Sequence, residues 1–153
     1  MIIIKNEREI EAMKEACRIS AGALKLAGEA VEPGVTTAEI DKLAYDYIKS
    51  QGAEPNFLGY GGFPGTACIS INNEVIHGIP GHRKIKNGDI VSIDLGAKIG
   101  GYNGDNAATF AAGDVSEEAK RLMEATEQSL YEGIKKAVAG NRIGDISHAV
   151  QQY

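Results

Sequence analysis

Hydrophobic and polar positions follow a helical period at the start of this chain. A capping box formed by Asn6 and Glu9 is followed by apolar residues at helical spacing, which predicts a helix that ends before Pro33. A second capping box, Thr36 with Glu39, predicts a second helix directly afterwards. The apolar stripes expected to face the core are Ile10, Met13, Cys17, Ala21 and Leu24 in the first helix, and Ile40, Leu43, Tyr47 and Ile48 in the second.

The period changes in the middle of the chain, where short apolar runs alternate with turn residues. Glycines and prolines punctuate aromatic residues from 56 to 66, which predicts an ordered loop of the kind that often lines a site. Strands are expected at Ala67 to Asn72, Ile90 to Ile99 and Tyr102 to Phe110. This order predicts a chain that mixes helices with strands.

The last third returns to a helical pattern. Ser116 is expected to cap a long helix that Gly140 ends, with Leu122, Met123, Leu130, Ile134 and Val138 as its apolar residues. Asp145 is the expected cap of one more helix. The sequence ends at Tyr153, after about two turns of that helix. The chain is therefore expected to stop inside an element.

Composition narrows the range of functions. With 153 residues and 43% hydrophobic residues, residues 1–153 are expected to form a single domain. The 16 Lys and Arg residues are outnumbered by 21 Asp and Glu residues and are not clustered, which disfavours a nucleic-acid partner. Cys17 and Cys68 fit no zinc or disulfide pattern, and the apolar start is too short for a signal peptide or a membrane span. A soluble cytoplasmic protein is expected, without a membrane partner.

One predicted strand has an apolar face and carries a carboxylate on its opposite face. From residue 91 to residue 99 the odd-numbered positions are apolar, so the side chain of Asp94 points to the other face. A two-residue hairpin loop at Ile99-Gly100 or at Gly100-Gly101 brings Asp105 opposite Asp94 or one diagonal step away. Both registers leave the two carboxylates on one face of the sheet.

Two carboxylates so close repel each other, and a divalent cation removes that conflict. Oxygen ligands of this kind suit Mn²⁺, Fe²⁺, Co²⁺ or Zn²⁺, and a pair of ions could share them and activate a water molecule. The alternative is that Asp94 and Asp105 are solvated residues on an exposed sheet face, which is common in antiparallel sheets.

The histidines and the second cysteine offer weaker indications. His77 ends an apolar segment at a Gly/Pro turn, where an imidazole could face a cavity and exchange protons near neutral pH. The alternative for His77 is a structural or solvated role. No function is assigned to His82 or His148, and Cys68 is by default a small buried hydrophobic residue.

Several segments in one order and spacing resemble type I methionine aminopeptidases, and the resemblance covers nearly the whole chain. The matching segments are Gly59-Tyr60, Phe63-Pro64, Cys68-Ile69-Ser70-Ile71-Asn72, Glu74-Val75-Ile76-His77-Gly78-Ile79-Pro80, Gly88-Asp89-Ile90-Val91-Ser92-Ile93-Asp94 and Gly104-Asp105. The resemblance implies an α/β (α+β) chain that forms half of a pita-bread (creatinase/aminopeptidase) fold, an antiparallel sheet with helices on one face. In that fold a dinuclear metal site lies between two pseudo-symmetric halves. Its implied activity is the removal of the initiator methionine from nascent chains and peptides.

The same resemblance implies roles for particular residues. Asp94 and Asp105 match the two aspartates that bind two divalent ions (Co, Mn, Fe or Zn), and His77 matches a histidine that contacts the substrate near the scissile peptide. The pocket for the methionine side chain would include Tyr60, Phe63 and Cys68, with Phe57 nearby. An unbranched thioether packs well against aromatic and sulfur surfaces.

Two departures from the family pattern bear on these roles. Gly61 follows Tyr60, whereas family members often carry a histidine between the tyrosine and the glycine of this loop. The remaining metal ligands of the family, a histidine in a Gly-His-Gly-type motif and two glutamates, match no segment of this chain. The chain alone is therefore expected to bind metal weakly or not at all and to be inactive.

Three other interpretations remain open. A pita-bread relative that has lost its ligands could serve as a non-catalytic binding module, although Asp94, Asp105 and His77 are present. The prolidases and creatinases share the aspartate pair, although the segment from Cys68 to Pro80 favours methionine aminopeptidase. Finally, this chain could be a half-enzyme that self-associates through exposed apolar surface, even though the parent is expected to be a monomer.

Overall fold

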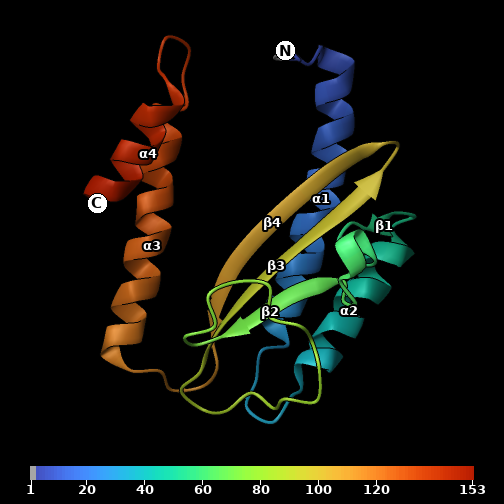
Figure 1. Cartoon of the computed structure of the whole chain (residues 1–153), viewed down its shortest axis with the longest axis vertical. Coiled ribbons are helices and arrows are strands. Elements are labelled where there is room, and N and C mark those ends of the chain that lie inside the picture. Colours follow the sequence, from blue (N-terminus) through green and yellow to red (C-terminus); the bar gives the residue numbers. More distant parts are fainter. Residues whose placement is uncertain (1–2) are drawn as a thin grey trace. The chain divides into compact units, whose positions relative to one another are not determined.

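The computed structural model describes residues 3–153 as two compact units, one up to Asp114 and one from Val115 to Tyr153. The first unit contains α1 (Glu7–Glu29), α2 (Thr37–Ser50), β1 (Glu54–Pro55), a 3-10 turn η1 (Tyr60–Gly62), β2 (Ala67–Ile71), β3 (Ile90–Ile99) and β4 (Tyr102–Ala111). The second contains α3 (Glu117–Lys136) and α4 (Ile143–Gln152) (Figure 1). The expectation of a single domain over residues 1–153 stays a prediction.

The sheet of the first unit is built around β3. The long strand β4 pairs with β3 over its whole length on one side, and β2 and the two-residue β1 pair with β3 on the other side, all antiparallel. Helices α1 and α2 pack against one face of this sheet (Figure 1). The predicted antiparallel sheet with helices on one face is confirmed.

The hairpin between β3 and β4 adopts one of the two predicted registers. Ile99 pairs with Tyr102, and Gly100 and Gly101 form the turn with φ of 58° and 85°. A two-residue hairpin turn of this type requires positive φ at both positions, which glycine adopts without steric cost. The loop at Gly100-Gly101 therefore sets the register of every pair along the hairpin.

The core lies between the sheet and the two helices. Val91, Ile93, Leu95 and Ala97 of β3 are fully buried, as their alternation predicts, and Ile99 at the end of the strand is partly buried. The inward residues of β2 are buried as well. The members of this cluster with essentially no exposed surface include Ile19, Ala23, Ala27, Ile40, Ala44, Ile48, Ile71, Val91, Ile93, Leu95 and Ala97. Burial of these branched side chains removes apolar surface from water and is the main stabilising contribution to the unit.

The buried face of α1 differs from the predicted stripe. Both capping boxes are confirmed, but Ile10 is 42% exposed and Cys17 is exposed, while Ala16 and Ala23 are fully buried. The reason is the close approach of α1 to β4, where a Cβ on Gly104 would lie 2.3 Å from the Ala16 carbonyl. Where α1 crosses Gly104, a small residue faces the sheet because a larger one would hold the helix away from it. In α2, Leu43 likewise lies partly outside the core, at 38% exposure.

The second unit is a pair of helices. Ser116 caps α3, as predicted, and its Oγ accepts a hydrogen bond from the Ala119 N–H at 3.1 Å. Helix α3 ends at Lys136 rather than at Gly140, so Val138 lies outside it. Asp145 is not the cap of α4. It is the third residue of that helix, and its carboxylate accepts a hydrogen bond from the Arg142 N–H at 2.7 Å.

Helix α3 carries an apolar stripe that is open to solvent. Leu122, Leu130 and Ile134 are 57%, 57% and 55% exposed. Because contiguous exposed apolar surface favours association, this chain is expected to form higher-order species as its concentration rises. Light scattering over a wide concentration range checks this, and replacing Leu122 and Ile134 with Lys should shift the distribution toward monomer. A monodisperse monomer at every concentration contradicts the prediction.

Among residues 3–153, no helix combines the length and the apolar character that a membrane crossing requires.

Candidate metal centre and substrate pocket

The candidate site lies on the face of the sheet that the helices leave open. Asp94 pairs directly with Cys68 of β2 on one side and with Ala107 of β4 on the other. Asp105 pairs with Gly96, two residues along β3 from Asp94 and on the same face. The structure therefore brings together the two aspartates and the cysteine that the sequence analysis selected.

The two carboxylates interact unfavourably. The pKa of Asp94 is raised, first by burial, then by the negative charge of Asp105 and by hydrogen-bonding contact with the Asp105 carboxyl. The charge of His77 acts in the opposite direction and lowers the pKa of Asp94. Each of these groups is thus close enough to influence Asp94, which makes the cluster a candidate functional site.

Cys68 forms part of the same cluster but is closed to solvent. Its exposed fraction is 5%, and it lies beside Asp94 at the centre of the sheet. Burial, followed by the charges of Asp94, Asp105 and Asp41, raises the pKa of the Cys68 thiol to about 11. A neutral thiol is the resting form, so Cys68 contributes an apolar and polarisable surface rather than a nucleophile.

The two cysteines should therefore differ in their reaction with iodoacetamide. Because only the thiolate reacts, alkylation of exposed Cys17 should precede that of Cys68, and the rate at Cys68 should keep rising toward pH 11. Mass spectrometry of peptides from brief reactions at each pH measures both rates. The Asp94→Asn variant should move the Cys68 profile to lower pH, since it removes a neighbouring negative charge. A Cys68 rate that levels off below pH 9 contradicts the assignment.

His77 is held at the outer edge of β2 by the residue that follows it. The Gly78 carbonyl accepts a hydrogen bond from the Ile69 N–H at 2.8 Å, and the Gly78 N–H donates to Ser70 Oγ at 3.1 Å. A Cβ on Gly78 would lie 2.2 Å from the Ile69 carbonyl oxygen, so glycine is required for this approach. His77 itself has a φ of 59°, a strained conformation for a residue with a side chain.

The loop from 56 to 66 begins beside Gly96, the β3 residue that pairs with Asp105. The Asn56 N–H donates to the Gly96 carbonyl at 3.0 Å, and the Asn56 side chain lies 3.0 Å from the position that a Gly96 Cβ would occupy. The loop then closes on itself through a hydrogen bond from the Gly59 N–H to the Phe63 carbonyl at 2.8 Å. The loop is therefore an ordered wall at one end of the site.

The aromatic residues of this loop are not equally buried. Phe57 and Phe63 are half-buried, whereas Tyr60 is 82% exposed at the tip of the loop. That these three residues and Cys68 form a pocket for a methionine side chain stays a prediction. A ligand that covers Tyr60 would also remove its apolar ring from water.

Two residues near this site escaped the sequence analysis. Asn56 packs over Gly96, and Asp41 of α2 reaches the start of β2 from outside the site. An isolated glycine inside a strand often marks the close approach of another segment, and Gly96 is such a residue. No comparable pattern points to Asp41, because its partners lie 25 and 26 residues away along the chain.

The donor set fits part of a metal centre. Asp94 and Asp105 offer oxygen ligands that suit divalent ions, and a cation between them would remove their mutual repulsion. Within the part of the chain that the structure describes, no group of three or more His, Cys, Asp or Glu side chains is placed to hold an ion. Two carboxylates therefore supply only part of a coordination shell.

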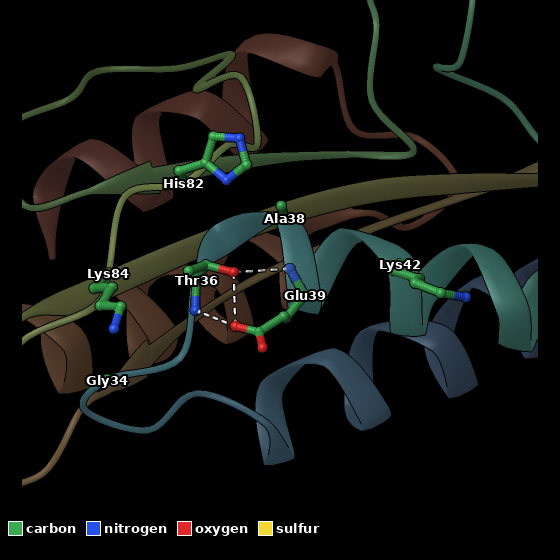
Figure 2. Close-up of a pocket in the computed structure, with 7 residues that line it drawn as sticks. All are labelled: Gly34, Thr36, Ala38, Glu39, Lys42, His82 and Lys84. Carbon is green, nitrogen blue, oxygen red and sulfur yellow. Dashed lines mark hydrogen bonds between the residues drawn. The ribbon is translucent and has the colours of Figure 1, made fainter.

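A separate pocket of about 490 Å³ lies at the first turn of α2, away from the aspartates (Figure 2). Its lining residues are Gly34, Thr36, Ala38, Glu39, Lys42, His82 and Lys84. Figure 2 shows that the Glu39 carboxylate is directed at Thr36, and it accepts hydrogen bonds from the Thr36 N–H and hydroxyl at 2.8 and 2.7 Å. These groups are occupied by the helix cap, so the pocket does not compete with the sheet face as the candidate site.

The chain belongs to metallopeptidase family M24, whose sequence profile matches residues 11–153. A methionine aminopeptidase of Clostridium acetobutylicum is 54% identical over 154 aligned residues, which cover 100% of this chain and 62% of that protein. The crystal structure of methionine aminopeptidase from Rickettsia prowazekii superimposes with a TM-score of 0.97 at 38% identity, over 100% of this chain and 62% of that one. The prolidase from Pyrococcus furiosus gives a TM-score of 0.87 at 27% identity, over 98% and 43% of the two chains.

These matches confirm the predicted pita-bread fold and the resemblance to type I methionine aminopeptidases. The chain spans 62% of the length of the curated relative from Clostridium acetobutylicum. Membership of a metallopeptidase family implies divalent metal ions, in agreement with the prediction made from the aspartate pair. The identity of the metals and the individual roles of Asp94, Asp105 and His77 remain predictions.

Proposed function

We propose that this chain, when completed by metal ligands beyond those it supplies, removes the amino-terminal methionine from peptides and nascent proteins. The observation that carries the proposal is the diagonal placement of Asp94 and Asp105 on the open sheet face, with His77 close enough to act on Asp94. The 54% identity to a methionine aminopeptidase across the whole chain supports the choice of substrate.

In this proposal Asp94 and Asp105 bind two divalent ions, drawn from Mn²⁺, Fe²⁺, Co²⁺ and Zn²⁺. Bound ions of this kind supply Lewis-acid polarisation of a carbonyl and a water molecule with a lowered pKa. Partial burial of Asp94 reduces the screening of its charge by bulk water, and the diagonal placement of Asp105 presents four carboxylate oxygens on one side of the sheet.

His77 and the pocket residues position the substrate. The anchored Gly78 holds His77 at the edge of the site, where its imidazole contacts the substrate near the scissile peptide and orients it. Cys68 offers a sulfur surface beside Asp94, and the loop from 56 to 66 contributes Phe57, Tyr60 and Phe63. The methionine thioether packs against these groups.

The choice between methionine removal and a prolidase-type activity has a direct test. We define the joined protein as this chain followed by the carboxy-terminal part of the Clostridium acetobutylicum relative, which supplies the remaining length. With Mn²⁺ or Co²⁺ present, the joined protein should release methionine from Met-Ala-Ser and should not cleave Ala-Pro or Met-Pro dipeptides. Cleavage of the proline peptides alone would select the prolidase alternative.

The chain on its own provides the control. Calorimetric titration with Mn²⁺ should give weak or absent binding, and methionine release should be undetectable, since two carboxylates leave an ion under-coordinated. Tight binding with turnover by the chain alone would contradict the requirement for further ligands. A joined protein that binds Mn²⁺ tightly but cleaves neither class of peptide would instead favour a non-catalytic binding module.

The substrate class also sets the partners and the compartment in this proposal. Amino-terminal methionines arise on nascent chains, so the protein would act in the cytoplasm on newly made proteins and peptides. The two free cysteines suit a reducing compartment. Fractionation of cells that produce the tagged protein, with methionine release assayed in each fraction, tests this placement.

A further inference from the structure

The carboxylate of Asp41 in α2 contacts the backbone at the start of β2, next to the candidate site. Oδ1 of Asp41 accepts hydrogen bonds from the backbone N–H groups of Thr66 and Ala67, both at 2.8 Å. Thr66 is 1% exposed and Ala67 is fully buried, so water does not replace this acceptor. Without Asp41, two adjacent backbone donors would lose their partner at the edge of the core.

The two anchored residues lie at a junction in the chain. Thr66 ends the loop that carries the aromatic residues, and Ala67 begins β2. The next residue is Cys68, which pairs directly with Asp94 across the sheet. A shift of the backbone at Thr66 and Ala67 would therefore move one wall of the candidate pocket relative to the aspartates.

Apart from these two hydrogen bonds, the surroundings of Asp41 disfavour the charged form of its carboxylate. Burial raises the pKa of Asp41, whereas the hydrogen bonds from Ala67 and Thr66 lower it. Within residues 3–153, Asp41 takes part in none of the ion pairs. A half-buried carboxylate without a cationic partner is retained where it satisfies buried donors.

A second side chain on the same face of α2 holds the other loop of the site. Thr37 lies one helical turn before Asp41, and such residues share a helix face. Its hydroxyl accepts a hydrogen bond from the Gly81 N–H at 2.9 Å and donates to the Gly81 carbonyl at 3.1 Å. Gly81 ends the segment that carries His77, so one face of α2 anchors both segments that border the open sheet face.

We propose that Asp41 is a positioning residue that sets the wall of the substrate pocket through the backbone of Thr66 and Ala67. Its role in binding the methionine side chain rests on the proposed function, whereas the anchoring itself does not. A single oxygen accepts both hydrogen bonds, so the acceptor matters more than the negative charge. An asparagine, which keeps Oδ1, should therefore preserve the wall, and an alanine should not.

The two cysteines of the chain make this testable without enzymatic activity. Iodoacetamide is added briefly, at one pH, to the purified wild type, Asp41→Ala and Asp41→Asn proteins. For each protein, the alkylation rate of Cys68 is divided by that of exposed Cys17 to give a ratio. The Asp41→Ala ratio should rise at least about tenfold, because two lost hydrogen bonds let the start of β2 open. The Asp41→Asn ratio should stay within about threefold of wild type, since the acceptor remains and the charge that is lost is the smallest of the three that raise the pKa of Cys68.

A matched control comes from the same helix. Asp46 is exposed and pairs with Lys42 at 2.6 Å, and such surface pairs contribute little to stability. Asp46→Ala should leave the Cys68 to Cys17 ratio unchanged. An increase in Asp46→Ala equal to that in Asp41→Ala would show general loosening of α2 and would overturn the specific role of Asp41.

Further outcomes are decisive in either direction. An unchanged ratio in Asp41→Ala with native circular dichroism overturns the proposal, and so does an Asp41→Asn ratio as high as that of Asp41→Ala. If Asp41→Ala does not fold, amide hydrogen exchange in wild type and in Asp41→Asn tests the proposal instead. Protected N–H groups at Thr66 and Ala67 in both wild type and Asp41→Asn support the proposal, and free exchange overturns it. The readout needs no turnover, so a failed methionine-release assay leaves the result interpretable.

Discussion

Replacing Asp94 or Asp105 with Asn in the joined protein is expected to weaken Mn²⁺ binding at least about a hundredfold and to abolish methionine release. Each substitution preserves shape and removes one anionic ligand from the open sheet face. Neither side chain contributes to the apolar core, so the fold should be retained. Calorimetry with Mn²⁺ measures the first effect, and methionine release from Met-Ala-Ser measures the second.

The same substitution should have the opposite effect on the stability of the metal-free chain. Because burial and Asp105 raise the pKa of Asp94 in the folded state, the folded chain holds this proton more tightly than the unfolded chain does. Stability therefore falls as pH rises from the ordinary pKa of an aspartate through the raised value. Above that interval the Asp94→Asn variant should be more stable than wild type, and below it the difference should vanish.

Urea unfolding of the metal-free chain at several pH values measures this difference directly. Ser92→Ala is a suitable control, since Ser92 is an exposed neutral residue on the same face of β3. Near-normal methionine release by either aspartate variant would contradict the metal assignment. A metal-free Asp94→Asn variant that is less stable than wild type at neutral pH would contradict the repulsion between the two carboxylates.

The largest expected loss of stability comes from Gly104→Ala. A Cβ at this position would lie 2.3 Å from the Ala16 carbonyl carbon and oxygen and 2.4 Å from the Cys17 nitrogen. These are backbone atoms of α1, so no side-chain rotation relieves the overlap, and the helix must move away from β4. We expect a decrease in the free energy of unfolding of at least about 2 kcal/mol.

Gly144→Ala provides the matched control. A Cβ on Gly144 has nothing within 4 Å, and this residue lies in α4. Alanine is favoured over glycine in helices, so this substitution should leave stability unchanged or raise it slightly. Equal urea midpoints for Gly104→Ala and wild type would show that α1 can shift without cost. Because Asp105 follows Gly104, Gly104→Ala in the joined protein should also weaken Mn²⁺ binding.

Features that depend on local chemistry could be read from the sequence. The capping boxes at Asn6 and Thr36 match the structure because their partners lie only three residues away. The turn at Gly100-Gly101 was one of two predicted registers, and the positive φ of both glycines explains why it forms. From that turn, the period of two along a strand is sufficient to place Asp94 and Asp105 on one face.

Features that depend on close approach between distant segments could not be read in the same way. The predicted stripe of α1 was right at Leu24 but wrong at Ile10 and Cys17, because Ala16 rather than a larger apolar residue meets β4 at Gly104. The helix pattern of hydrophobic residues favours bulky side chains, whereas tight packing against a strand favours small ones. The roles of Asn56 and Asp41 were missed for a related reason, since their partners are far along the chain.

The sequence by itself determined the order of helices and strands, the hairpin that carries the aspartates, and the family through motifs in a characteristic order. These follow from spacing and turn chemistry, which act over a few residues. Only the tertiary structure decided that Cys68 lies beside Asp94, that Gly78 holds His77 at the edge of β2, and that α2 anchors the pocket wall. Such contacts depend on how segments pack, because a hydrogen bond across 26 residues leaves no local pattern in the sequence.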